Sequence, residues 1–314
     1  MVRIFYKEKK QIRKENDVRM LSQIPNVIWV DLQSPSPEEE EWIESKCQVS
    51  FQTPQEIVEI ESSARFFEQG DMMVANSNFS KIDQHGYHSY PVSFLIKNTT
   101  LFTYRQGDSK TFADTVKKMR VYVEPFETGI DIFLLLLETR IEADADLLEN
   151  MSREITNISK SLSNEKKPKQ EILLKINTLQ ENSMMLRESI IDKQRVLSSI
   201  QRSRLFPESY RERLRIVLKD ISSLTEYTTF NFERLEYLQD TFTGLINLEQ
   251  NQIIKIFTVV TIVFLPPTLI AGIFGMNYQV MPTVLHPYGF YLALILMMLS
   301  STAVLWFFKR KHWI

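Results

Sequence analysis

The distribution of polar and hydrophobic residues changes abruptly near the C-terminal end of the chain. From Ile256 to Phe308 the sequence contains no Asp, Glu, Lys or Arg. A stretch of this length can cross a bilayer twice, because each crossing needs about 20 apolar residues. Gly, Pro and Asn residues between Gly275 and Gly289 interrupt it with turn signals. The pattern therefore predicts two transmembrane helices, at about 253–275 and 288–308.

Small and hydroxylated residues recur within the first of these segments at alternating steps of three and four. Such residues share one face of a helix, while Val and Ile occupy the other faces. This face suits either close packing against another helix or the lining of a water-filled path. The pattern alone favours packing, which is the commoner use. The positions are Asn251, Ile254, Phe257 or Thr258, Thr261, Leu265, Thr268, Gly272 and Gly275.

The first 125 or so residues show the mixed pattern of an α/β domain. Residues 27–32 form a short run rich in β-branched residues. Ser36, Pro37 and Glu38 follow it and have the order of a helix start, with a capping side chain, an early proline and an acidic first turn. Further strands are predicted at 72–75, 91–96 and 100–104.

Two long segments with helical periodicity follow, at 130–163 and 168–204, within a predicted helical region of residues 126–205. The polar turn between them predicts an antiparallel helical hairpin. The first helix carries a series of carboxylates, and an acidic face is usually a solvated face. These residues are Glu138, Glu142, Asp144, Asp146, Glu149 and Glu154.

A third helix is predicted to begin near Phe206 and to form a stalk over residues 206–250. No strong helix breaker follows until Pro266. A helix continuing into the membrane would be roughly 100 Å long at 1.5 Å per residue. Such a helix needs neighbours along its length. Parallel copies around a symmetry axis would supply them, so the pattern predicts an oligomer with the polar membrane face on the axis.

Charge and cysteine content exclude several functions. The formal net charge of −2 gives no reason to expect a nucleic-acid partner. A single cysteine, Cys47, excludes an intrachain disulfide framework and a multi-cysteine metal site. The chain has no Gly-rich phosphate loop ending in Lys-Ser/Thr and no dense cluster of catalytic residue types. We therefore expect a protein that is not an enzyme.

The charge pattern around the apolar segments predicts the orientation in the membrane. The first 16 residues are highly charged and lack the apolar core of a secretory signal. Lys255 precedes the first span and Lys309–Lys311 follow the second, whereas the loop between the spans has no Lys or Arg. By the positive-inside rule, residues 1–250 and the C-terminus are predicted to be cytoplasmic.

The end of the first span carries a recognisable motif. Phe274-Gly275-Met276-Asn277 closes the segment, and Pro267–Gly272 precedes it. Together with the short loop, the second span and the basic tail, these residues resemble the CorA family of divalent-cation channels, whose hallmark is Tyr-Gly-Met-Asn. Here Phe274 replaces the Tyr. The resemblance covers the architecture of the whole chain, although its specific motifs lie in the last quarter.

The resemblance implies an α+β cytoplasmic domain with a long helical stalk and two C-terminal transmembrane helices, assembled as a funnel-shaped homopentamer. It divides the chain into a cytoplasmic domain (1–250, with an α/β part at 1–125) and a transmembrane pore domain (251–314). Acidic hairpin helices near the cytoplasmic mouth are thought to influence cations in this family, and the carboxylates at 138–154 could share that role.

The resemblance also assigns roles to pore residues. It implies a selectivity filter of Gly275, Met276 and Asn277, in which side-chain carbonyls of Asn277 form an outer ring for a hydrated cation. Phe257 and Leu265 correspond to hydrophobic constrictions. The remaining lining positions are Asn251, Ile254, Thr261, Thr268 and Gly272.

Two departures from the family pattern bear on the ion and its regulation. Magnesium-transporting members often have an acidic residue just after the Asn, but residues 278–283 carry no charge. The related ZntB branch also has an uncharged loop, which keeps zinc, cobalt or nickel as alternative cargo. The family's regulatory Asp falls on Ile216 in an ungapped count, and Asp220 is the nearest carboxylate, which makes it the candidate regulatory metal ligand.

The sequence thus predicts passive transport of a divalent cation, foremost Mg²⁺, through a homopentamer in the inner membrane. A divalent ion crossing ~100 mV gains about 4.6 kcal/mol, so the membrane potential can drive uptake without ATP. Expected partners are membrane lipids and divalent cations, with Mg²⁺ as cargo and possible regulator and no organic cofactor. An alternative of another class is a membrane-anchored scaffold or signalling protein.

Overall fold

The structure is a computed structural model that describes residues 1–9, 11–52, 65–83, 86–121, 126–164, 170–276 and 288–311. These residues form two compact units, one of residues up to Gln239 and one from Asp240 onward. Helix α7 (Arg211–Phe274) contributes residues to both units and is continuous through residue 250. Each unit is described below by itself.

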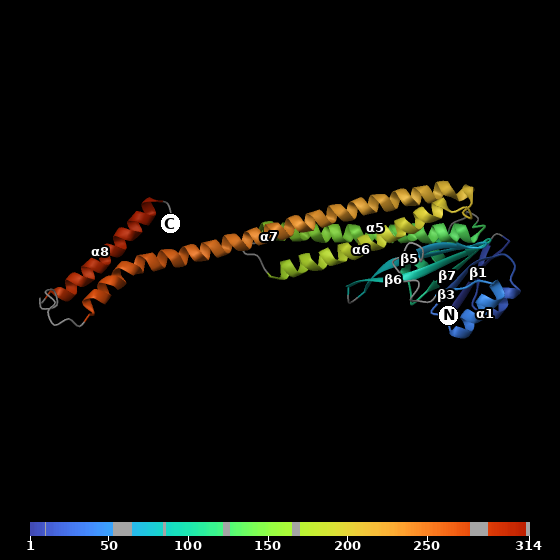
Figure 1. The fold of residues 1–314 in the computed structure, drawn as a ribbon, viewed down its shortest axis with the longest axis horizontal. Helices are drawn as coiled ribbons and strands as arrows, with labels where there is room; N and C mark the ends of the chain where they lie inside the picture. The colour runs from blue at the N-terminus through green and yellow to red at the C-terminus, as the bar shows by residue number, and fades with distance from the viewer. Residues whose placement is uncertain are drawn as a thin grey trace. The chain divides into compact units, whose positions relative to one another are not determined.

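A seven-stranded mixed sheet forms the centre of the first unit (Figure 1). Its strand order is β2-β1-β3-β7-β6-β5-β4. The β3–β7 pair is parallel, and every other neighbouring pair is antiparallel. The strands are β1 (Val2–Glu8), β2 (Gln11–Glu15), β3 (Val27–Gln33), β4 (Phe66–Gln69), β5 (Met72–Asp83), β6 (Gly86–Lys97) and β7 (Thr100–Arg105).

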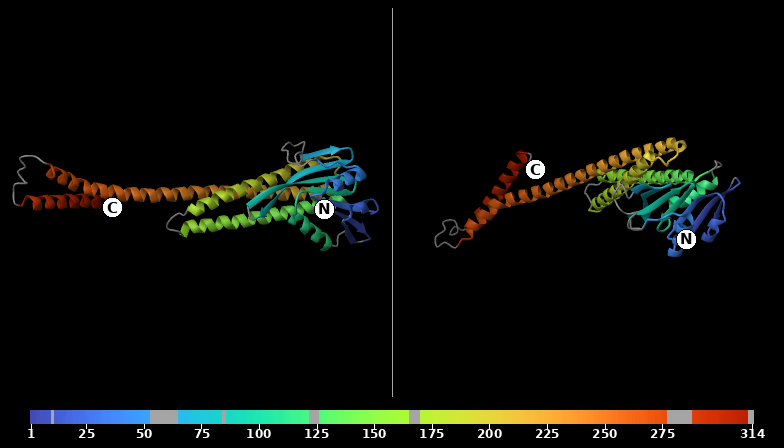
Figure 2. Two further views of the ribbon diagram at one scale, coloured as in Figure 1. Left: turned by 90° about the horizontal axis from the view of Figure 1, so that it is seen from below. Right: turned by 45° about the vertical axis from the view of Figure 1, so that its right-hand side comes forward.

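The sheet is buried on both faces, and the alternation of side chains along its strands explains how. In β6, Val92, Phe94 and Ile96 join the core that the long helices cover, whereas Leu95 joins a second core on the other face. Successive side chains of a strand point to opposite faces, so consecutive apolar residues of a central strand can serve both cores. Figure 2 shows the two long helices of the hairpin lying along one face of the sheet.

The second core is closed by helix α1 (Pro37–Cys47), which follows a short 3₁₀ helix η1 (Val18–Ser22) and strand β3. Its start has the capping that the sequence predicted. The Ser36 hydroxyl accepts a hydrogen bond from the Glu39 backbone N–H at 3.2 Å, and the Glu39 carboxylate accepts one from the Ser36 N–H at 3.0 Å. This capping box satisfies two backbone donors of the first turn.

A buried carboxylate joins three neighbouring strands at the middle of the sheet. Asp31 of β3 is fully buried and accepts hydrogen bonds from Arg3 of β1 at 2.9 Å and from Thr103 of β7 at 2.8 Å. Arg105 of β7 donates to both Asp31 oxygens, at 3.2 and 3.1 Å. A buried charge is tolerated when it is paired and hydrogen-bonded in this way, and removal of either partner is costly.

Four helices cover the first core. After α4 (Lys110–Val121), the chain forms the antiparallel hairpin of α5 (Gly129–Asn164) and α6 (Gln170–Arg202), and the 3₁₀ helix η2 (Glu208–Tyr210) leads into α7. The predicted helical hairpin is therefore confirmed. Residues from α4, α5, α6 and the first turns of α7 share a single core with the sheet.

The second unit contains the last part of α7 and helix α8 (Gly289–Arg310), which runs back antiparallel to it. Both helices are long and apolar enough to cross a membrane. Within the 18-residue apolar stretch of α7 no residue is buried, and 6% of the corresponding stretch of α8 is buried. In contrast, a core helix of a soluble protein would be mostly covered. The two candidate spans agree with those predicted from the sequence.

Gly129 allows the first turn of α5 to approach the sheet closely. A methyl group at this position would lie 2.7 Å from the Thr100 carbonyl carbon and 2.8 Å from the Ile28 carbonyl oxygen, both backbone atoms. We therefore expect Gly129→Ala to destabilise the protein by about 1–3 kcal/mol, the usual cost of overpacking. The measurement is thermal unfolding of the purified full chain in detergent.

Gly244→Ala is the matched control. Gly244 lies inside α7 and a methyl group there meets nothing within 4 Å. Because alanine favours the helix, the control should raise stability by roughly 0.5–1 kcal/mol. If Gly129→Ala unfolds at the same temperature as the unmodified protein, the close approach does not hold.

Candidate pore-lining segment

The candidate pore segment is the last part of α7, from Asn251 to Phe274, with Gly275 and Met276 after it. The helix continues through Pro266 and Pro267 without interruption. Two prolines remove two backbone donors and favour a bend. Figures 1 and 2 show that α7 changes direction near its C-terminal end.

One face of this segment packs against α8. It is made of Val259, Val263, Pro266, Ile270 and Phe274, which recur at helical spacing and are partly buried. The Ser301 hydroxyl of α8 donates a hydrogen bond to the Val263 carbonyl at 3.3 Å. The covered side of α8 is likewise one stripe, consisting of Ala293, Met297, Ser301, Val304 and Phe308.

The predicted lining stripe occupies a different face. Every position from Asn251 to Gly275 that the sequence assigned to the stripe is exposed, including Ile254 at 61%, Phe257 at 69% and Leu265 at 62%. At about 100° per residue, the stripe lies nearly opposite the face that packs on α8. Packing against α8 therefore does not use this stripe, which stays available to water or to another copy of the chain.

The threonine side chains on the stripe have a specific hydrogen-bonding state. Thr258, Thr261 and Thr268 each donate the hydroxyl proton to the backbone carbonyl four residues earlier, at 2.8, 2.9 and 2.7 Å. A hydroxyl oxygen that has donated its proton still has acceptor lone pairs. A hydrated cation presents O–H donors at its outer surface, so these oxygens match the shell of such an ion.

The two glycines at the end of the segment differ in their surroundings. A methyl group on Gly275 would lie 3.1 Å from the Ala271 carbonyl oxygen, which is tighter than ordinary contact. The Gly275 N–H donates to that same oxygen at 2.8 Å. Gly272 faces open space. Met276 is exposed, and Asn277, the expected outer ring, lies outside the described residues. The filter assignment of Gly275, Met276 and Asn277 therefore stays a prediction.

The carboxylates of α5 are mostly neutralised by nearby cations. Glu138 forms two hydrogen bonds with the Arg213 guanidinium, at 2.6 and 2.7 Å. Asp144 is buried between Arg140 and Lys193. The other pairs are Glu142–Lys118, Glu149–Arg153 and Glu154–Lys175. Five of the six carboxylates thus have a cationic partner within the chain, which weakens the case for a cation-collecting acidic face.

The candidate regulatory residue Asp220 is exposed on α7. Across the described residues, no group of three His, Cys, Asp or Glu side chains is placed to hold a metal ion. A site at Asp220 would therefore need further ligands from another copy of the chain, and its role stays a prediction.

Comparison with known proteins agrees with this architecture. The family model described as "CorA-like Mg2+ transporter protein" matches residues 26–310. A relative named "Magnesium transport protein CorA", from Wolinella succinogenes, is 36% identical over the full length of both chains. The chain belongs to the CorA-like family, which is a family of transporters and not of enzymes.

Solved structures confirm the fold. The complete structure of the CorA magnesium transporter from Methanocaldococcus jannaschii superimposes with a TM-score of 0.85, at 22% identity, covering 100% of this chain and 99% of that one. The ZntB cytoplasmic domain from Vibrio parahaemolyticus matches with a TM-score of 0.63 at 13% identity, covering 79% of this chain and 98% of that one. The predicted fold class, with sheet domain, long helix and two C-terminal spans, is thus confirmed.

The exposed stripe leads to a labelling prediction. In a background with Cys47→Ser, cysteine at Thr261 or Thr268 should react with a water-soluble thiol reagent in membranes, because the thiolate forms only where water reaches. Cysteine at Val260, which is exposed on another face, should react at least ~10-fold more slowly, since hydrocarbon disfavours the thiolate. The measurement is the labelling rate by mass spectrometry. Equal rates at the three positions would mean that the stripe does not line a watery path.

Proposed function

We propose that the chain forms a passive divalent-cation channel with Mg²⁺ as its principal cargo. The observation that carries the proposal is the exposed stripe of hydroxyl oxygens and small residues on α7, opposite the face that packs on α8. Magnesium gives up its hydration water reluctantly. A path lined by neutral acceptors can hold the hydrated ion without binding it too tightly to release it.

Assembly as a homopentamer is part of the proposal. In the first unit, large apolar side chains stand exposed along α7, including Ile216 at 56%, Phe230 at 53% and Tyr237 at 69%. Exposed apolar surface of this extent on one helix favours contact with further copies. A ring of copies would also bring the stripes of several α7 helices around a common axis. The number five comes from the resemblance to the CorA family.

Within this channel, Asn277 would form the outer ring, with Gly275 and Met276 holding the turn that aims it. Phe257 and Leu265 would form apolar constrictions able to gate by dewetting. Asn251, Ile254, Thr261, Thr268 and Gly272 would complete the lining. The membrane potential would drive uptake across the inner membrane, with residues 1–250 and residues 309–314 on the cytoplasmic side.

We name Mg²⁺ as the cargo, in place of zinc, cobalt or nickel, because relatives that match the full chain are named magnesium transport proteins. The uncharged segment 278–283 is the feature that favours the other metals. Its lack of carboxylates weakens the concentration of cations at the mouth by long-range attraction.

Ion uptake into vesicles tests the proposal directly. The purified protein is reconstituted into vesicles with an imposed potassium diffusion potential, and entry of Mg²⁺, Zn²⁺ and Co²⁺ is compared with a fluorescent indicator. We expect Mg²⁺ entry that increases with the inside-negative potential. Asn277→Ala should reduce the rate about tenfold or more, because one lost hydrogen bond to a charged group costs about 1.5–3 kcal/mol.

Thr302→Ala is the matched control for effects of altering a membrane helix. Thr302 lies exposed on α8 and donates to the Met298 carbonyl at 2.7 Å, as the stripe threonines do on α7. This variant should transport normally. Zn²⁺ entry that exceeds Mg²⁺ entry would favour the zinc alternative. If none of the three ions enters, and Asn277→Ala therefore changes nothing that the assay measures, a membrane-anchored scaffold would be favoured.

A regulatory site at Asp220 gives a separate prediction. If Asp220 binds Mg²⁺ together with groups from a neighbouring copy, Mg²⁺ should slow proteolysis of the unmodified protein. Asp220→Ala should abolish that protection because its carboxylate is lost, whereas Asp240→Ala, at another carboxylate of α7, should retain it. The measurement is the digestion rate with and without Mg²⁺. Protection that survives Asp220→Ala would exclude this residue.

A further inference from the structure

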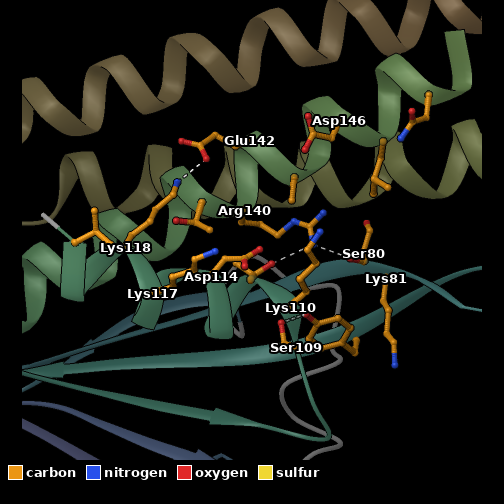
Figure 3. A pocket seen from close by; sticks show the side chains of 17 residues that line it. Ser80, Lys81, Ser109, Lys110, Asp114, Lys117, Lys118, Arg140, Glu142 and Asp146 are labelled. Carbon is orange, nitrogen blue, oxygen red and sulfur yellow. Dashed lines mark hydrogen bonds and ion pairs between the residues drawn. The ribbon is translucent and has the colours of Figure 1, made fainter. Parts of the chain in front are cut away.

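A cavity of about 680 Å³ lies in the first unit, separate from the pore segment. Its walls come from α4 and α5 and from the strands β5 and β6 (Figure 3). Pockets for small molecules usually have volumes of about 300–1,000 Å³, so this one has the size of a ligand site. Neither the transport path nor the assembly proposed above uses it.

The cavity is lined by basic side chains. Lys81, Lys110 and Lys117 reach it from β5 and from α4, and none of the three forms a salt bridge within the part of the chain that the structure describes. The first turn of α4, at Lys110 and Thr111, also borders the cavity. The N-terminus of a helix carries partial positive charge, which adds to the attraction for an anion.

Arg140 provides an independent indication of a ligand. Its side chain is 3% exposed and extends from α5 toward Ser80, whose carbonyl accepts a hydrogen bond from it at 2.7 Å (Figure 3). The Arg140 Nε–H, however, has no hydrogen-bond partner in the described structure. The same is true of the neighbouring Thr139 hydroxyl, which also lines the cavity and is 4% exposed. Buried polar groups are almost always satisfied, so two such groups beside one cavity wall are unusual. Both atoms lie just behind the surface of the wall, so a ligand would reach them only after a small shift of the side chains in front of them.

The guanidinium is held in place from behind. Asp144 pairs with Arg140 one helical turn away and with Lys193 of α6 at 3.2 Å. Lys193 also donates to the Ser189 hydroxyl at 2.7 Å. Burial lowers the pKa of Lys193, and the Asp144 carboxylate opposes that shift. Asp192 is a second carboxylate that acts on Lys193. Asp144 therefore fixes the Arg140 guanidinium from behind, and the charge available to an anion comes from the side chains that line the cavity.

We propose that the cavity binds a phosphate-bearing organic anion of nucleotide size. The phosphate would accept hydrogen bonds from Arg140, from the Thr139 hydroxyl and from Lys110 at the start of α4. A guanidinium recognises phosphate well because its donors form a planar fork. Inorganic phosphate would fill only a small part of 680 Å³, so the volume requires an organic part as well.

The remaining wall suits that organic part. Leu147 and the ring of Tyr90 offer apolar surface, and the Asn150 amide offers a donor and an acceptor. Three carboxylates also line the cavity, of which Glu142 is paired with Lys118. Asp114 and Asp146 would repel a phosphate placed beside them but would accept hydrogen bonds from hydroxyl or amino groups. The cavity therefore distinguishes a nucleotide-like ligand from a simple inorganic anion.

The test is calorimetric binding of ATP to the purified full chain in detergent, with EDTA present so that Mg²⁺ binding elsewhere contributes nothing. We expect saturable binding of ATP, weaker binding of inorganic phosphate and none of adenosine, which lacks phosphate. The double variant Lys110→Gln, Lys117→Gln should bind ATP at least ~10-fold more weakly, since two favourable charges are lost at the cavity. Both lysines are exposed, so the fold should tolerate the change.

The matched control is the double variant Lys160→Gln, Lys219→Gln, which removes two exposed lysines outside the cavity. It should bind ATP as tightly as the unmodified protein. Arg140→Lys keeps the charge but removes the Nε–H, and it should also weaken binding; its folding is checked by thermal unfolding. The proposal is overturned if ATP does not bind or if the variant Lys110→Gln, Lys117→Gln retains full affinity for ATP. None of these results depends on ion transport.

Discussion

Helix α7 has to satisfy every backbone group in hydrocarbon while presenting different surfaces on its different sides. Water is absent from the bilayer core, so a helix that crosses it cannot leave polar groups unpaired. The threonines of the stripe meet this requirement because each hydroxyl proton returns to its own helix. The hydroxyl oxygen can then act only as a hydrogen-bond acceptor, and the water molecules around a hydrated cation are hydrogen-bond donors. The same local bond thus satisfies the hydroxyl proton and leaves the acceptor that the proposed channel would use.

The opposite side of α7 packs against α8. This contact consists of partly buried apolar residues and the hydrogen bond from Ser301 to the Val263 carbonyl. Because α8 packs on the opposite side, the predicted lining stripe stays exposed in the single chain. Leu265 and Phe257 are exposed, as are Ile256, Phe264 and Leu269 on other faces of the segment. Exposure alone therefore does not distinguish surface that meets lipid from surface that meets another copy of the chain.

The first unit is organised by buried charge as well as by apolar packing. Asp31 joins β1, β3 and β7 at the sheet centre, and Asp144 joins α5 to α6 through Lys193. Both carboxylates are inside the protein and form ion pairs with neighbouring cations, so their role is structural. Arg140 differs from these two carboxylates because it also lines a cavity, with its Nε–H lacking a hydrogen-bond partner. Its position at the cavity wall separates a candidate ligand site from an ordinary buried ion pair.

The sequence alone determined the two spans, the helical hairpin and the face of α7 that carries the stripe. Each of these follows from local periodicity or from the length of an uncharged run, which need no knowledge of distant contacts. It also indicated the strands at 27–32, 72–75, 91–96 and 100–104. It did not indicate β2, an edge strand whose sequence is mostly polar. It also did not indicate β1, although Val2, Ile4 and Phe5 of this strand are buried between β2 and β3. Helix α4 was not predicted either, although its buried Phe112, Thr115 and Met119 recur at helical spacing.

Only the tertiary structure decided which charges are free. The carboxylates of α5 look like one acidic face in the sequence, yet Arg213, Lys118 and Lys193 reach them from other helices. Likewise, nothing local marks Arg140 as a residue with an unsatisfied donor at a cavity wall. Partners of charged groups are brought together by packing between elements far apart in the chain. Periodicity therefore fixes the faces of each helix, whereas the contacts that neutralise or expose a charge depend on the assembled fold.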